Sequence, residues 1–389
     1  MAGKKSINID VETSVIKWAF ESSGWTKEDF SKRLKITTEL LDKWLSGEVK
    51  PTLKQLEDFS IVIKRPLAIF FLSEPPQEPN PPKDFRMLPD RVDKFDKKTL
   101  LAIRRARRLQ DISKELSENL DSSLSPKIKF CSVKDDPKKI AEVYRGEFKF
   151  NEEVHRKAKG SYGLFHLLRE LIEDRNILVF QISMPLEDAR GFALLNGSPA
   201  LIVVNSRDII EARIFTLMHE FGHVILNEPG ISIPENSLFI NNIDKVEKWC
   251  NDFSSAFLLP EDMAKKIFSA NKDNLTDSKT LQKLSNTYKL SKAMLLYNMH
   301  KLSYISNEYY NEIIDRFKKS QKTEEKSKGT KKGGFGAKAD VKCLKEKGDK
   351  FVSLVANNIE KGFITHSDAL SFLSIKLKSL DKVMRKTKK

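Results

Sequence analysis

Two histidines separated by three residues are the strongest chemical signal in this sequence. His219, Glu220 and His223 form an HExxH pattern within the apolar-framed segment FTLMHEFGHVIL. Four residues advance an α-helix by about 400°, so both imidazoles project from one face and can share a metal ion. Glu220 stands beside them, where its carboxylate can accept a proton from a water molecule held at the metal. The pattern predicts metal-dependent hydrolysis of peptide bonds, with Zn²⁺ as the expected ion and Mn²⁺ as the alternative.

Glu247 is the predicted third ligand of this ion. A catalytic zinc takes three protein ligands and keeps a fourth position open, so a further histidine or carboxylate must come from a later element. The segment VEKWCNDFSSAFLLPEDM has helical apolar spacing and carries Glu247 one turn before Asn251. We expect Asn251 to hold the first helix or one of its histidines from outside the ligand set. The alternative is a chance match on a surface helix, but the apolar frame and Gly222, which permits close packing, favour a site.

The remaining histidines are weaker candidates. His166 lies on the apolar face of LFHLL and is expected to be a satisfied core residue, whereas His155 and His366 stand among charged or loop residues and need no role. Three residues of LLYNMHKLSYI are either packing residues or hydrogen-bond donors to a transition state: Tyr297, His300 and Tyr304.

The elements that must position the HExxH helix alternate between strands and helices. Strands are predicted at 127–133, 177–183, 191–197 and 199–205, and helices near 138–147, 161–174, 208–226 and 277–305. This order predicts an α+β layer with a small sheet. A metallopeptidase of this kind binds its substrate as an added strand, and PALIVVN (199–205) is the predicted edge strand for that pairing.

The amino-terminal region reads as short helices joined by tight turns. Thr26 followed by Asp29 predicts a helix starting at Lys27, a turn follows near Lys35 and Ile36, and the next helix closes at Gly47, which suits a helix-turn-helix. In such a unit the start of the second helix reads bases and nearby lysines contact phosphates. The predicted DNA contacts are Lys35, Thr37, Thr38, Lys43 and Lys50. A protein-interaction module is the alternative.

Composition shifts divide the chain into five predicted segments. The proline-rich stretch 74–86 predicts a linker, and the helix that follows carries Arg104, Arg105, Arg107 and Arg108 on either a solvated or a nucleic-acid-binding face. The lysine- and glycine-rich stretch 318–342 has little to bury and precedes a terminal two-helix unit that docks on the peptidase or on a partner. The predicted segments are 1–75, 76–126, 127–306, 307–349 and 350–389.

Bulk properties limit the remaining classes of protein. The 389 residues carry a formal charge of +15, which points to anionic partners unless the excess lysine only aids solubility. Three widely spaced cysteines, Cys131, Cys250 and Cys343, support neither a disulfide framework nor a cysteine metal cage. The start lacks an apolar signal core and no run is long enough for a membrane span, so we expect a soluble cytoplasmic protein rather than a secreted digestive protease.

These motifs resemble a known family. FTLMHEFGH followed by EKWCNDFSSAFLLP is similar to the ImmA/IrrE family of metallopeptidases, whose members have an HExxH helix and a later E-x-x-A-N-x-F-A element. The resemblance implies a zincin-like domain in which His219, His223 and Glu247 bind the metal and Glu220 is catalytic. Cys250 and Ser254 stand where alanines are usual.

The flanking regions resemble parts of the longer fused members. WLSGEVKPTLKQLEDF, KRPLAIFFL and PKDFR are similar to an XRE-type helix-turn-helix domain, although Leu45 stands where that family commonly has glutamate. VSLVANNIEKGFITHSDALSFL is similar to the carboxy-terminal extension, a small helical unit. The resemblance implies site-specific cleavage of a helix-turn-helix repressor in stress or mobile-element regulation. A DNA-binding regulator or toxin–antitoxin component with a structural or sensory metal site is the alternative.

Overall fold

The computed structural model of the chain describes residues 8–77, 95–228, 231–232, 245–313, 316 and 338–387. These residues form two compact units, one comprising residues 8–77 and 95–103 and the other comprising residues 104–387. The proline-rich stretch lies mostly outside the described residues, as does most of the lysine- and glycine-rich stretch. No helix within these described ranges is both long and apolar enough to cross a membrane.

The first unit is a cluster of short helices, as expected. Its elements are α1 Thr13–Glu21, α2 Lys27–Leu34, α3 Thr38–Ser46, α4 Leu53–Ile63 and the 3₁₀ helix η1 Leu67–Phe71. Thr26 caps α2 by accepting from the backbone N–H of Asp29, and Lys35 ends that helix with a left-handed φ of 58°. Thr37 caps α3 and Gly47 ends it at φ 80°. Side chains of Phe30, Phe59 and Phe70 pack edge to face at the centre.

The second unit is an α+β structure with a four-stranded sheet, which confirms the predicted class. Its strands are β1 Leu178–Ile182, β2 Gly191–Leu194, β3 Leu201–Asn205 and β4 Ile231–Ser232, in the order β1-β3-β2-β4. β1 is parallel to β3 from Leu178↔Leu201, whereas β2 is antiparallel to both β3 and β4. Every residue of β1, β2 and β3 is buried, as expected for a sheet covered on both faces.

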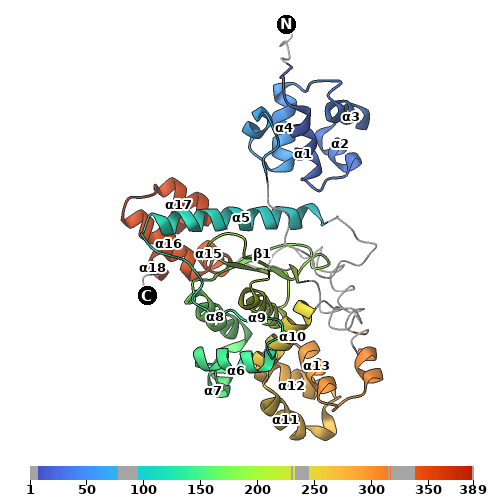
Figure 1. Cartoon of the computed structure of the whole chain (residues 1–389), viewed down its shortest axis with the longest axis vertical. Coiled ribbons are helices and arrows are strands. Elements are labelled where there is room, and N and C mark those ends of the chain that lie inside the picture. The colour runs from blue at the N-terminus through green and yellow to red at the C-terminus, as the bar shows by residue number, and fades with distance from the viewer. Residues whose placement is uncertain are drawn as a thin grey trace. The chain divides into compact units, whose positions relative to one another are not determined.

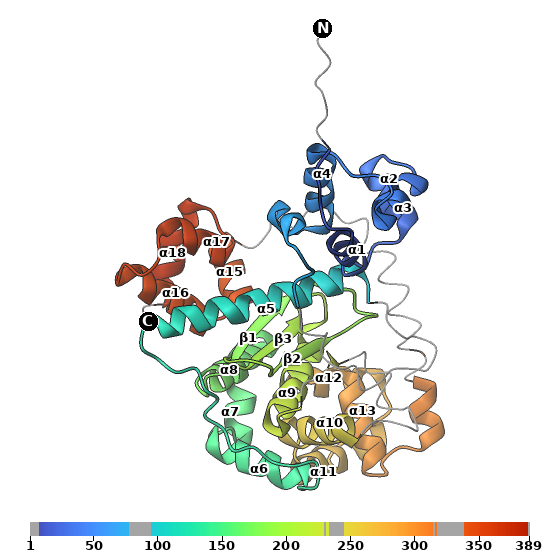
Figure 2. The same ribbon diagram turned by 45° about the horizontal axis from the view of Figure 1, so that its top comes forward.

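Helices cover the sheet on both sides. The part of helix α5 (Lys97–Glu118) that belongs to this unit, from Arg104 on, lies over one face, where Gln110 donates to the Pro199 carbonyl, and α8 and α9 lie against the other (Figure 2). The remaining helices of the central part are α6 Pro137–Glu147, α7 Glu152–Lys157, α8 Gly160–Glu173, α9 Ile210–Leu226, α10 Lys245–Leu258, α11 Glu261–Ser269, η3 Lys272–Asn274, α12 Ser278–Tyr288 and α13 Lys292–Lys301.

Two sequence-based predictions about strands are wrong. Residues 127–133 form no strand, because their backbone turns to other partners: Lys127 N–H donates to the Arg175 carbonyl and Cys131 N–H to that of Ile225. The segment containing β3 is not an edge, since β1 and β2 flank it. The short strand β4 occupies the edge next to β2 instead.

Residues 338–387 contain four helices, and three of them lie in the terminal unit that was predicted to have two. They are α15 Ala339–Lys347, α16 Asp349–Glu360, α17 His366–Leu373 and α18 Leu377–Thr387, and α15 lies within the segment predicted to be a linker. These helices gather at the β1 end of the sheet (Figure 1). Gln181 of β1 donates to the Lys345 carbonyl at 2.7 Å, so the unit docks on the sheet.

Candidate metal centre

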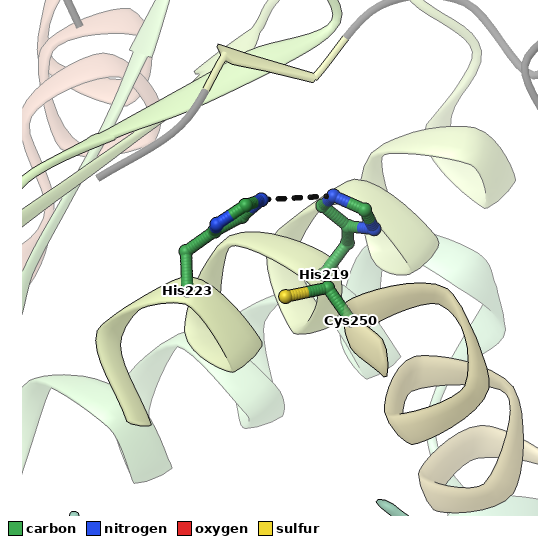
Figure 3. A group of neighbouring side chains, drawn as sticks. All are labelled: His219, His223 and Cys250. Carbon is green, nitrogen blue, oxygen red and sulfur yellow. Dashed lines mark hydrogen bonds between the residues drawn. The ribbon is translucent and has the colours of Figure 1, made fainter. Parts of the chain in front are cut away.

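Helix α9 presents both histidines of the HExxH pattern. It packs between the sheet and α10, and from Thr216 to its end at Leu226 every residue is buried. The helix stops at Asn227, whose left-handed φ of 53° turns the chain back over the last turn. His219 and His223 lie one turn apart on one face, and their Nε2 atoms are 3.2 Å from each other (Figure 3).

The turn that ends α9 also orients His223. Glu228 N–H donates to the His223 carbonyl at 3.0 Å, which brings the Glu228 carbonyl back to the ring. The Nδ1 atom of His223 lies 3.0 Å from that carbonyl oxygen and donates its proton to it. With the Nδ1 proton held by that carbonyl, Nε2 is the ring atom directed toward His219, and it can bind a metal ion once it carries no proton.

Helix α10 brings Glu247 to the same point. Its Oε2 is 3.4 Å from Nε2 of His219 and its Oε1 is 3.1 Å from Nε2 of His223, and the side chain is fully buried. Burial alone would raise the pKa of Glu247, but the two imidazoles hold that pKa well below its ordinary value. Conversely, burial lowers the pKa of His223, but Cys250 and Glu247 raise it well above its ordinary value. The site therefore favours positive charge where these atoms meet.

The donor atoms suit a divalent transition metal. Two imidazole nitrogens and one carboxylate, drawn from two helices and shielded from solvent, form the set that zinc takes at hydrolytic sites. The structure thus brings together the three predicted ligands, although their role as ligands stays a prediction.

Glu220 sits on the sheet side of this cluster. Its carboxylate is fully buried, and its Oε1 lies only 3.0 Å from the position that a Cβ atom on Gly191 of β2 would occupy. The same hypothetical atom would be 2.6 Å from the Thr216 methyl group and 2.8 Å from the Val203 carbonyl oxygen. Gly191 therefore provides the space in which the Glu220 carboxylate rests. Sequence reasoning missed this glycine because nothing local marks it as a neighbour of α9.

Cys250 is a second residue that sequence reasoning left out of the site. One ligand atom each from His219, His223 and Cys250 lie within 4.8 Å of one another, and all three residues are buried. Asn251 follows on α10 and is 4 % exposed, and its expected supporting role stays a prediction.

The predicted DNA contacts lie at or near α3 in the first unit. Lys35 is the residue that ends α2, the Thr37 hydroxyl accepts from Leu40 N–H to cap α3, and Thr38 is the first residue of that helix. Two lysines are engaged in ion pairs: Lys43 with Glu48 at 3.4 Å and Lys50 with Asp10 at 2.6 Å. The contacts with DNA stay a prediction.

The structure contradicts the expectation that His166 is a core residue, and it buries His155, for which no role was expected. His166 is exposed and bridges Glu170 and Asp349 at 3.3 Å each, because its face of α8 meets the start of α16 rather than the core. His155 is fully buried, its Nε2 donates to the Tyr288 carbonyl at 2.7 Å, and burial lowers its pKa to about 4.

The candidate transition-state donors have partners of their own. Tyr297 donates to Asp252, His300 lies 3.2 Å from the Asn307 side chain, and Tyr304 bonds with Ser269 on α11. These contacts support the packing alternative for all three residues.

Comparison with protein families agrees with this location of the site. Residues 172–300 match the model of the peptidase M78 family, described as the IrrE N-terminal-like domain. The matched segment contains β1 to β4, α9 and α10, and thus every residue of the cluster. The chain therefore contains a domain of metallopeptidase type. No significant match to a curated protein is found.

Proposed function

We propose that the chain is a zinc-dependent, site-specific endopeptidase of the ImmA/IrrE type, with a zincin-like domain. The observation that carries the proposal is the convergence of His219 and His223 from α9 with Glu247 from α10, beside the buried Glu220. The peptidase family match over the same segment supports it.

The residues divide the chemistry between them. His219, His223 and Glu247 would hold Zn²⁺, which when bound polarises a carbonyl group and lowers the pKa of a water molecule. Glu220 accepts a proton from the attacking water as the water oxygen adds to the scissile carbon. The same carboxyl group then delivers the proton to the leaving nitrogen as the carbon–nitrogen bond breaks.

The sheet offers one side for an extended substrate. At the β1 edge, Lys345 of α15 receives hydrogen bonds from Gln181 and Arg169, so that edge is occupied by this chain itself. At the opposite side, the two described residues of β4 pair with Gly191 and Phe192 of β2. Gly191 also lies in space beside the Glu220 carboxylate. We therefore propose that the peptide lies along the β2–β4 side of the sheet.

The substrate we propose is a helix-turn-helix repressor, as the family resemblance implies, and the first unit is the part suited to recruiting it. The described residues of the first unit, 8–77 and 95–103, contain twelve lysines and arginines against twelve aspartates and glutamates, so they carry no net charge in a chain of +15. Duplex binding depends on a surplus of positive charge over phosphates. This balance favours a protein ligand over duplex DNA.

Replacing Glu220 with Gln tests the proposed function. We expect cleavage of the repressor encoded beside this gene to fall by about 10²–10⁴-fold, since the amide cannot accept the proton. Zinc content should not change, because Glu220 is not a ligand. The readout is the appearance of repressor fragments over time on a denaturing gel.

A matched control lies on the same helix. Glu211 in the first turn of α9 accepts from the Ser161 hydroxyl at 2.6 Å and belongs to no part of the site. Glu211→Gln should cut at the wild-type rate. Full-rate cleavage by the Glu220 variant would refute the assigned role.

A further inference from the structure

Cys250 projects from α10 toward the histidine pair. It follows Glu247 by three residues, so the two side chains leave the helix on the same side, facing α9. Figure 3 shows its sulfur directed toward α9 beneath the two imidazole rings. The side chain is fully buried, so solvent does not compete for the sulfur.

Gly222 allows this close approach. A Cβ atom at Gly222 would lie 3.2 Å from the Cys250 sulfur and 3.3 Å from its Cβ. Because Gly222 has no side chain, α10 can come near enough for the thiol to reach the level of the two histidines. The sulfur and one nitrogen of each ring all lie within 4.8 Å of one another, so the three atoms surround a point at which a metal ion could bind.

We propose that Cys250 is a fourth protein ligand of the metal. The inference rests on the proposed metal centre, and it concerns the regulation of that centre. Thiolate is a strong zinc ligand, and four protein ligands make a closed site, whereas a hydrolytic site needs an exchangeable position. With Cys250 bound, the thiol proton is released to solvent and the position needed by the attacking water is filled. Cleavage is blocked while the sulfur is bound, so the cleavage that the Glu220 test measures comes from molecules whose sulfur has left the metal.

Cobalt substitution separates a ligand from a packing residue. Co²⁺ replaces Zn²⁺ in such sites, and a thiolate bound to it gives a sulfur-to-cobalt charge-transfer band in the near ultraviolet. The full chain is stripped of metal, loaded with one equivalent of Co²⁺ and compared with Cys250→Ala and Cys250→Ser. Cys343→Ala is the matched control, since Cys343 is a buried thiol that bonds to the Leu373 carbonyl far along the chain.

The expected result is a charge-transfer band in the wild type and in Cys343→Ala, and loss of that band in both Cys250 variants with Co²⁺ still bound. Loss of the band in the two Cys250 variants, with Co²⁺ still bound, assigns the thiolate to Cys250, and a band that persists in them would overturn that role. Stoichiometric Co²⁺ without the band in the wild type would overturn the role of Cys250 but leave the metal centre intact. Failure of the wild type to bind Co²⁺ would overturn both.

Discussion

Gly191 has more influence on the reactive carboxylate than its lack of a side chain suggests. The residue is in a strand, where glycine is unfavourable, yet a methyl group there would meet the Thr216 methyl, the Val203 carbonyl and Glu220 Oε1 within 3.0 Å. Two of these atoms belong to α9, so any side chain at position 191 pushes that helix or turns the carboxylate away.

Gly191→Ala should therefore reduce cleavage while leaving zinc bound. We expect a loss of about 1–3 kcal/mol in the free energy of unfolding from overpacking, and a fall in kcat that exceeds any change in KM. Denaturant unfolding and metal analysis of the same preparation measure the two effects.

Gly146→Ala is the control for this substitution. Gly146 lies in α6 and an added Cβ there meets no atom within 4 Å, so alanine should stabilise the helix by up to about 1 kcal/mol. Wild-type kcat in the Gly191 variant would show that Glu220 does not depend on this space.

At the scale of elements, local sequence patterns predicted most helices and strands, but they did not always predict which elements lie next to each other. Helix α9 and strands β1, β2 and β3 were predicted because their apolar residues repeat at helical or strand spacing. The edge position was not, because β4 lies beyond α9 in the sequence and its pairing with β2 leaves no local trace. Cys250 and Gly191 were missed for the same reason, since their importance comes from contacts between elements.

Helix α15 is a second case in which tertiary contacts override composition. Its sequence ADVKCLKEK has few apolar residues, and for that reason it was predicted to be part of a linker. Arg169 of α8 donates to the carbonyls of Leu344 and Lys345 near its end, and also to Val179 of β1 and to Glu173. Arg169 and Glu173 are both only 5 % exposed in their side chains, so the pair joins three elements in the interior.

Arg169→Met should destabilise the docking of α15. It removes three carbonyl partners and leaves the Glu173 carboxylate buried without its cation, for a loss of about 3–5 kcal/mol. Glu173→Leu in the same chain removes the stranded charge and should recover part of that loss. Hydrogen exchange of the α15 amides and chemical unfolding measure the loss in the single variant and its recovery in the double variant.

An exposed ion pair is the control for the buried pair of Arg169 and Glu173. Lys157 pairs with Glu153 at 2.5 Å while both side chains are largely exposed, so Lys157→Met should change stability by no more than about 1 kcal/mol. Equal losses in the single Arg169 variant and in the double variant would mean that Glu173 is not held by Arg169.

At the scale of the whole molecule, positive charge is unevenly distributed. The first unit carries no surplus, so the +15 of the chain comes from other residues. Two lysines expected to contact phosphates are already paired with Glu48 and Asp10. Duplex binding by the full chain, if it is measured, should thus arise outside residues 8–77.

The double variant Lys43→Ala/Lys50→Ala tests this distribution. We expect the dependence of duplex affinity on salt to stay the same as in the wild type, because neither lysine displaces counterions from DNA. Fluorescence anisotropy over a series of salt concentrations measures the slope. A decrease in slope of about 2 would instead assign one phosphate contact to each lysine and restore the DNA-reading role of this unit.

The most direct test of the account is the zinc affinity of Glu247→Gln compared with Glu220→Gln and the wild type. Each purified chain is loaded with one equivalent of zinc and titrated with a chelator, and the bound metal is measured by mass spectrometry. The wild type and Glu220→Gln should release zinc at the same chelator concentration, and Glu247→Gln at a much lower one. Equal retention by Glu247→Gln would contradict the assignment of Glu247 as a ligand and, with it, the proposed metal centre.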